Sequence, residues 1–293
     1  MTWHRYDLVF RLLSPLHVGY RKTGNLMQTR GYVPGKNLWA ALTARLTRDH
    51  VPGATYHAYQ RIGDMLKTHF RFTYLYPALP QNSTQNVTST ADVTVCYPWH
   101  DPELFDYRLL SSYASTALNY DRQAAEDSLL HEVEFIRSYA EPVDDGEPLP
   151  VYLVGAVYTQ AELPNELNGW KEALRRIELG GERKYGWGRV RLASPLDRWQ
   201  GQVDEPSVSC QIDDAVQAHV LAQGADLVGQ VEPLVGWERN NTDTGSNWRL
   251  SPATICFAPG SVVKRVAQPL TFEIGAFGIW QQVNNVGNEQ KAP

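Results

Sequence analysis

The sequence lacks the marks of several large classes of protein. Its three cysteines, Cys96, Cys210 and Cys256, are odd in number and far apart, which fits neither a disulfide framework nor a CxxC metal clip. No stretch approaches the ~18 uninterrupted apolar residues of a membrane span, and the first residues do not resemble a secretory signal. We therefore expect a cytoplasmic protein with reduced cysteines that binds no metal, no cofactor and no membrane.

The composition that is present suffices for a folded core. The chain has 293 residues, of which 43% are hydrophobic and 20% charged, and this balance excludes a disordered chain. At ~150 residues per domain, the length corresponds to one elaborated domain or to two domains. No glycine period or heptad run indicates a fibre.

The net charge of −5 conceals a strong asymmetry along the chain. Residues 1–75 hold eleven basic and three acidic side chains, whereas residues 101–150 hold three basic and twelve acidic ones. A smaller basic island spans residues 182–191, with four basic side chains and one acidic. Two basic segments in an acidic protein can form one surface for an anionic ligand, although scattered charge on solvated faces would give the same counts.

The pattern of apolar residues predicts an α+β fold. Extended apolar runs predict strands at 6–13, 151–158 and 188–192. Apolar spacings of three and four predict helices over 38–46, near 124–133 and from Pro164 to the glycines at 180–181. A long loop is expected over 19–35, and strands and turns over the last hundred residues. The order strand, helix, glycine loop, strand in 151–192 makes half of a ferredoxin-like arrangement.

The most specific local signal is the loop after the second of these strands and its helix. Four glycines fall within nine positions: Gly180, Gly181, Gly186 and Gly188. Such a backbone can turn its N–H groups toward phosphate oxygens, and the loop adds basic charge and aromatic faces on which bases can stack. The other candidate RNA-binding residues of the loop are Arg183, Lys184, Tyr185, Trp187 and Arg189. A plain helix stop followed by a glycine-relieved turn is the alternative interpretation.

A second signal lies near the N-terminus. The run Pro15-Leu16-His17-Val18-Gly19 is followed by a basic loop and then by Pro34-Gly35-Lys36, where a helix is expected to begin. A helix that opens after Pro-Gly-Lys presents N–H groups and the positive end of its dipole to a phosphate. The candidate RNA-binding residues of this region are His17, Arg21, Lys22, Arg30 and Lys36.

Together the two segments resemble the RAMP superfamily of CRISPR-associated proteins, the RNA-recognition-motif-like subunits of RNA-guided effector complexes. The family pattern P-L-H-x-G matches residues 15–19, and its hallmark G-G-x-x-x-x-G-x-G-x-hydrophobic runs without a gap over 180–190. The resemblance covers residues 5–48 and 130–192. This sequence departs from the family at Lys36-Asn37, where serine is usual, and at Trp39-Ala40, where a basic residue and glycine are common.

The resemblance implies a ferredoxin-like or RRM-like βαββαβ core in residues 1–192, with an acidic insertion around 76–150. Residues 193–293 would be a strand-rich C-terminal extension or a second RRM-like half. Segments 231–236 and 255–262 resemble the larger family members that hold the 5′ tag of the guide RNA. The implied partners are the CRISPR guide RNA, the other effector subunits and, in the assembled complex, target RNA.

The resemblance also bears on catalysis. In the target-cleaving subunits of type III complexes, the loop after P-L-H-x-G carries an aspartate needed for metal-dependent cutting. Residues 20–33 contain no carboxylate, so this loop offers a divalent metal no charged oxygen ligand. The implied function is a non-catalytic guide-RNA-binding structural subunit of a type III complex in antiviral defence.

Two alternatives stay open at this point. Some relatives are metal-independent endoribonucleases that process CRISPR repeat RNA, and His17 would then be the general acid or base. The weaker alternative is an unrelated globular protein in which the glycine loop is only a turn.

Overall fold

The computed structural model describes residues 1–82, 86–125, 130–143, 145–242, 245–264 and 268–283. The fold is α+β, as the sequence predicts. The helices of the described residues are α1 (Gly35–His50), α2 (Tyr56–His69), α3 (Pro102–Leu109) and α4 (Trp170–Leu174). Single 3₁₀ turns lie at Thr90–Asp92, Asn165–Leu167 and Arg183–Tyr185. None of these described helices is long and apolar enough to cross a membrane.

The main sheet is built on two long antiparallel strands, β1 (Trp3–Leu12) and β13 (Tyr152–Gln160). Its order is β14-β1-β13-β5-β6, with β15 also on β1 and β4 also on β13, and every pairing is antiparallel. The shorter strands are β4 (Phe70–Phe72), β5 (Tyr76–Pro80), β6 (Val93–Val95), β14 (Val190–Leu192) and β15 (Gly201–Val203). The strands predicted at 6–13, 151–158 and 188–192 are confirmed.

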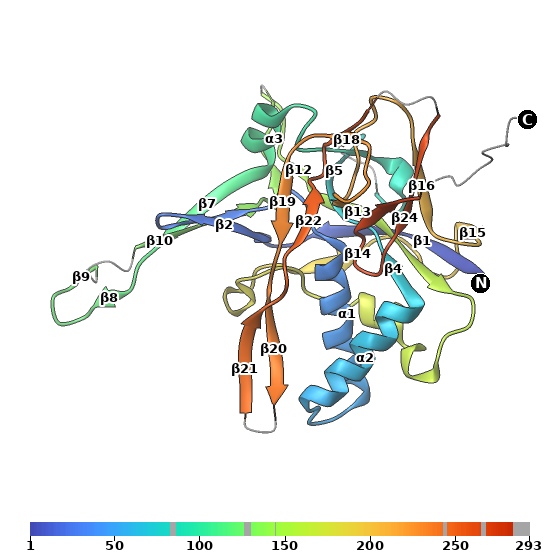
Figure 1. The fold of residues 1–293 in the computed structure, drawn as a ribbon. Helices are drawn as coiled ribbons and strands as arrows, with labels where there is room; N and C mark the ends of the chain where they lie inside the picture. The colour runs from blue at the N-terminus through green and yellow to red at the C-terminus, as the bar shows by residue number, and fades with distance from the viewer. Residues whose placement is uncertain (83–85, 126–129, 144, 243–244, 265–267, 284–293) are drawn as a thin grey trace, which may run out of the picture.

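Helices α1, α2 and α4 supply the apolar side chains that cover one face of this sheet (Figure 1). Because side chains alternate along a strand, Leu8 and Phe10 of β1 both enter the same core, where Leu42 of α1 is also fully buried. Burial of each such side chain contributes about 1.5–3 kcal/mol. The helix predicted over 38–46 is confirmed, and the glycine loop connects the segment after α4 to β14 of this sheet.

A second, four-stranded sheet projects from the body and is here called the arm (Figure 1). Its order is β2-β3-β10-β7, and β3 and β10 pair in parallel. The strands are β2 (Gly19–Thr23), β3 (Leu26–Thr29), β7 (Leu110–Ser115) and β10 (His131–Ile136). The short pair β8 (Leu118–Asn119) and β9 (Ala124–Ala125) lies at its far end.

The C-terminal part is rich in strands, as expected. Its six-stranded sheet has the order β16-β24-β25-β17-β22-β19. These strands are β16 (Ser207–Cys210), β17 (Val220–Leu221), β19 (Val231–Leu234), β22 (Thr254–Phe257), β24 (Leu270–Ile274) and β25 (Trp280–Gln282). Two-stranded pairs are β11 (Tyr139–Ala140) with β12 (Leu149–Pro150), β18 (Leu227–Val228) with β23 (Val262–Val263), and β20 (Trp237–Thr242) with β21 (Gly245–Leu250).

The two parts of the chain share a core. Tyr32 and Tyr74 from the N-terminal part pack in one buried cluster with Val220 and Phe272 from the C-terminal sheet. The expected boundary between residues 192 and 193 stays a prediction, and β15 shows that residues 201–203 still pair with β1.

Three predictions of local structure are wrong. The helix near 124–133 is absent from the described residues there, because Val133 lies in β10 and pairs with both β7 and β3. The loop at 19–35 contains the hairpin β2–β3, which Gly24 turns with a φ of +61°. The helix from Pro164 is broken into a 3₁₀ turn and the short α4, although its apolar stripe is buried as expected.

Candidate nucleic-acid interface

The glycine loop sits directly on the Pro15–His17 segment. The Gly181 N–H donates to the His17 carbonyl oxygen (2.8 Å), and the Gly188 N–H donates to the Pro15 carbonyl oxygen (2.7 Å). The Arg189 N–H donates to Ser14 Oγ (2.9 Å), across 175 positions of sequence. The structure therefore joins the two segments singled out from the sequence into one site.

Two of the glycines are required by close approach of the backbone. Gly180 has a φ of +74°, and a Cβ there would lie 2.2 Å from the His17 carbonyl oxygen. Gly188 has a φ of +76°, and its Cβ would lie 1.8 Å from the carbonyl oxygen of Leu179. No side chain fits either position, since both the left-handed backbone and the space require glycine.

The expectation that the loop amides are turned toward a phosphate is wrong for much of the loop. Besides the three amides bound to residues 14–17, the Tyr185 N–H donates to Glu182 O (2.9 Å) and the Gly186 N–H to Arg183 O (3.0 Å). These donors are already used within the protein. Contact with an anion would therefore depend more on the basic side chains that the loop presents.

Those side chains are exposed. Arg183 bends back so that its Nε donates to Gly180 O (3.1 Å), while Lys184 and Arg189 point outward and form no ion pair within the described residues. Tyr185 has 75% of its surface exposed. Trp187 is half-buried and makes an edge contact with Phe135 of β10, their ring centres 5.0 Å apart. The loop thus offers charge and an open aromatic ring at the base of the arm.

The His17 side chain is buried and hydrogen-bonded within the protein, and it is not exposed to a ligand in solvent. It is 8% exposed, and its Nδ1 contacts the Glu134 carbonyl oxygen at 2.7 Å, which requires the proton on that nitrogen. Its ring edge lies beneath Gly181, where a Cβ would be 3.3 Å from His17 Cδ2. The geometry gives His17 a positioning role under the glycine loop, and the alternative of general acid–base catalysis stays a hypothesis.

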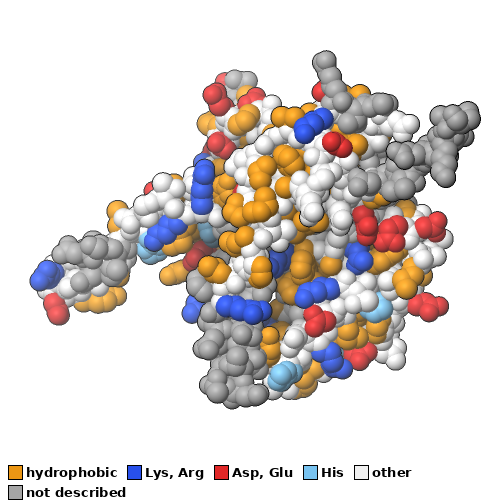
Figure 2. Space-filling view, viewed as in Figure 1, with side chains coloured by type: hydrophobic (Ala, Val, Ile, Leu, Met, Phe, Trp, Pro, Cys, Tyr) orange, Lys and Arg blue, Asp and Glu red, His pale blue; other side chains and the backbone are white. Residues whose placement is uncertain are grey.

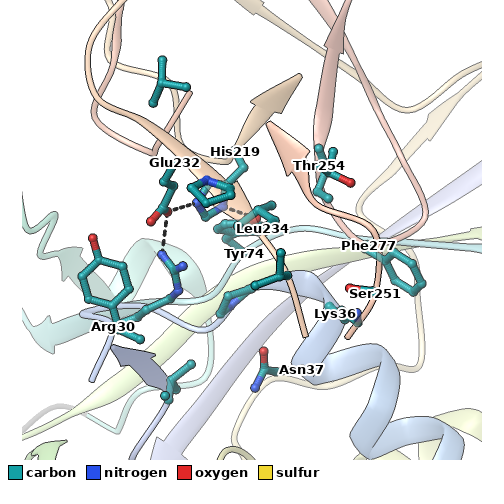
Figure 3. A pocket seen from close by; sticks show the side chains of 18 of the residues that line it. Arg30, Lys36, Asn37, Tyr74, His219, Glu232, Leu234, Ser251, Thr254 and Phe277 are labelled. Atoms are coloured by element: carbon teal, nitrogen blue, oxygen red, sulfur yellow. Dashed lines mark hydrogen bonds and ion pairs between the residues drawn. The ribbon is translucent and has the colours of Figure 1, made fainter. Parts of the chain in front are cut away.

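The other predicted basic residues fall into two groups. On the arm, the Arg21 guanidinium donates to Gln28 Oε1 (2.8 Å), and Lys22 is exposed. Away from the arm, Arg30 and Lys36 line a cavity of about 810 Å³ between the N-terminal part and strands β19 and β22 (Figure 3). The first turn of α1 opens into this cavity at Asn37, so the expected phosphate seat faces open space.

A buried polar network closes one side of the cavity, and the sequence analysis did not find it. Arg30 donates to Glu232 Oε1 (2.8 Å), and His219 Nε2 contacts the same Glu232 oxygen (Figure 3). Arg30 also donates to the Tyr32 hydroxyl (2.9 Å). The Tyr74 hydroxyl bonds His219 Nδ1 at 2.6 Å. A neutral His219 protonated on Nε2 satisfies every partner.

The electrostatics of this network follow from its burial. Burial alone would raise the pKa of Glu232, but hydrogen bonds from His219 and Arg30, with the charge of Arg30, lower that pKa to about 2. Burial, assisted by the nearby Arg30 charge, lowers the pKa of His219 below its usual value and keeps the ring neutral. The sequence does contain a signal for this buried network, because Glu232 is a lone carboxylate in the apolar run Val231–Val235.

Among the described residues, no group of three or more histidine, cysteine, aspartate or glutamate side chains is placed to hold a metal ion. No family model and no curated protein matches the sequence. Comparison with solved structures finds chains of Type III-B Cmr-beta complexes at 12% sequence identity. The complex bound to cognate target RNA and AMPPnP gives a TM-score of 0.46, covering 88% of this chain and 86% of that one.

Two further Cmr-beta structures are less similar. The complex bound to cognate target RNA gives a TM-score of 0.40 (64% of this chain, 96% of that one), and the apo state gives 0.38 (67% and 97%). With TM-scores below 0.5, these likenesses do not assign a role to this chain. The functional argument below depends on the motifs and on the geometry of the site.

Proposed function

We propose that this chain is a non-catalytic guide-RNA-binding subunit of a type III CRISPR ribonucleoprotein, of the kind that holds the 5′ tag. The observation that carries the proposal is the seating of the glycine loop on residues 14–17, which joins the two segments of the RAMP pattern. Arg183, Lys184 and Arg189 then provide exposed charge beside Tyr185. Contacts to phosphates would fix the register of the RNA without selecting its sequence.

The strand order supports a ferredoxin-like core within this proposal. β1, β4 with β5, β13 and β14 are the four core strands in chain order, and they lie side by side as β14-β1-β13-β5 with antiparallel neighbours. Helices α1 and α2 connect the first pair and α4 the second. The arm and the segment around α3 are then insertions into this core.

The cavity beside Arg30 is where a constant tag would fit the proposal best. Its walls combine Lys36 and the first turn of α1 with apolar side chains from β19, including Leu234 (Figure 3). Cationic and apolar surfaces together suit the phosphates and bases of a few nucleotides. The residues that line the cavity come from both parts of the chain, which agrees with a binding site for the 5′ tag that only the larger family members have.

The test is RNA binding by purified variants. Arg183→Ala and Arg189→Ala should weaken binding of labelled guide RNAs equally for different spacers, and each should reduce the slope of log affinity against log salt by about 0.7. Arg61→Ala is the control, because Arg61 is exposed on α2 and pairs with Glu166. Unchanged affinity and slope in both loop variants would show that the loop is only a helix stop.

A second measurement separates binding from processing. The purified protein is incubated with CRISPR repeat RNA in EDTA, and the products are separated on a denaturing gel. We expect intact RNA. A cut at one fixed position that His17→Ala abolishes, with RNA binding retained, would instead establish the metal-independent endoribonuclease.

A further inference from the structure

The arm has two faces of opposite chemistry, which follow from its strand register. In β10, Val133 and Phe135 lie on one face, and Glu132 and Glu134 on the other, because side chains alternate along a strand. Glu132 bonds the Ser112 hydroxyl and Glu134 accepts from the Thr29 N–H at 2.8 Å, so both carboxylates are held on their own side. The face with Phe135 carries neither of these carboxylates.

One row of paired residues crosses the carboxylate-free face from edge to edge. Lys22 on β2 pairs with Met27 on β3, Met27 with Val133 on β10, and Val133 with Tyr113 on β7. Tyr113 is 61% exposed although it sits in the middle of a strand. Val133 is buried, so the row runs from an exposed cation, over apolar side chains that are wholly or partly covered, to an open aromatic ring; we call this face the aromatic face.

The aromatic face is continuous with the glycine loop. Phe135 is the next residue along β10 on the same side as Val133, and its ring meets Trp187 at a centre distance of 5.0 Å. Diagonal neighbours in adjacent strands lie about 7–8 Å apart, so Tyr113 is one diagonal step from Phe135. Figure 2 shows basic side chains along the arm beside apolar ones. Charge at the loop and rings on the arm therefore belong to one surface.

From this juxtaposition we infer that the aromatic face of the arm, with the exposed ring of Tyr113 on its edge strand β7, is a base-stacking platform for the single-stranded RNA whose phosphates the glycine loop contacts. The inference rests on the proposed function and adds the stacking residues to it. Stacking on a ring accepts any base, which matches a surface that must take different spacers. RNA is favoured over a protein partner because the carboxylates face away and the platform adjoins the basic loop.

The test compares Tyr113→Ala with Tyr113→Phe, using a fluorescein-labelled single-stranded repeat–spacer RNA. We expect the alanine variant to weaken binding about 5- to 150-fold, and the phenylalanine variant less than about twofold, because the ring is retained. The salt slope should stay at its original value in Tyr113→Ala, since no phosphate contact is removed. Tyr107→Ala is the matched control: Tyr107 is 59% exposed but lies on α3.

A second measurement tests whether the binding lost in Tyr113→Ala comes from contact with the bases of the RNA. The loss caused by Tyr113→Ala should disappear when the RNA carries abasic residues in the stretch that 4-thiouridine crosslinking maps to β7. If Tyr113→Ala binds RNA normally while Arg183→Ala and Arg189→Ala do not, the platform is refuted and the proposed function stands. If all three bind normally, the proposed function fails. If Tyr113→Ala reduces only assembly with another protein subunit, the aromatic face is a protein interface and the inference is wrong.

Discussion

Replacing Glu232 by glutamine removes the carboxylate that joins Arg30 to His219 while keeping the size of the side chain. The Arg30 and Glu232 side chains are only 13% and 10% exposed, so solvent does little to screen the charge left behind. A fall in the pKa of Glu232 from 4.5 to about 2 corresponds to about 3 kcal/mol of stability at neutral pH. Loss of one partner of a buried pair typically costs about 3–5 kcal/mol, which agrees.

The two shifted pKa values decide whether stability rises or falls with pH. Because the folded-state pKa of Glu232 is lowered, its contribution is complete above about pH 4.5 and is lost as the pH falls toward 2. His219 acts in the same direction: with a folded pKa below its usual 6.5, it costs nothing at higher pH and destabilises the fold as the pH falls below 6.5. Acidification should therefore weaken the contact between the two parts of the chain in two stages.

Urea unfolding followed by tryptophan fluorescence measures both effects. At pH 7, Glu232→Gln should lower the free energy of unfolding by about 3 kcal/mol, and the difference from the unmodified protein should shrink as the pH falls below 4.5. Glu166→Gln is the control, because the exposed Glu166–Arg61 pair should contribute less than about 1 kcal/mol. A loss below about 1 kcal/mol in Glu232→Gln, or one independent of pH, would refute the assignment of this network.

Two further predictions concern the site and its support. Gly180→Ala should destabilise the protein by more than about 2 kcal/mol, because a Cβ would overlap His17 O, whereas Gly186→Ala, with a similar φ of +80° but open space, should cost about 1 kcal/mol; equal urea midpoints for the two variants would contradict this. Tyr74→Phe should cost about 1–3 kcal/mol, because it leaves His219 Nδ1 without its donor; thermal unfolding indistinguishable from the unmodified protein would show that the hydroxyl is not needed.

The elements predicted correctly are those whose pattern is local. Each of β1, β13 and α1 carries apolar residues at the spacing typical of its own secondary structure. These residues are buried against one another in one core. The failed helix near 124–133 shows the limit. Val133, the last residue of the predicted helix, lies in β10 instead. Pairing of β10 with β3 and β7 decides the conformation there, and that pairing depends on strands up to about a hundred positions away.

The candidate site, like the fold, could be predicted from the sequence only in part. The glycine loop is visible in the sequence because positive φ angles and close approach require glycine itself. The use of the Gly181 and Gly188 amides is not visible in the sequence, because their acceptors are the carbonyls of residues 17 and 15, far away in the chain. The Arg30–Glu232 contact likewise joins residues 202 positions apart, and only a lone carboxylate in an apolar strand hints at it.

Charge counts along the chain treat residues 101–150 as one acidic block. In the structure, the acidic side chains of β10 in this block lie on one face of the arm only. Glu132 and Glu134 belong to it, yet the two-residue period of β10 directs them away from Phe135 and Tyr113. Residues 101–150 have a net charge of −9, yet the pleat of β10 leaves one face of the arm without these two carboxylates.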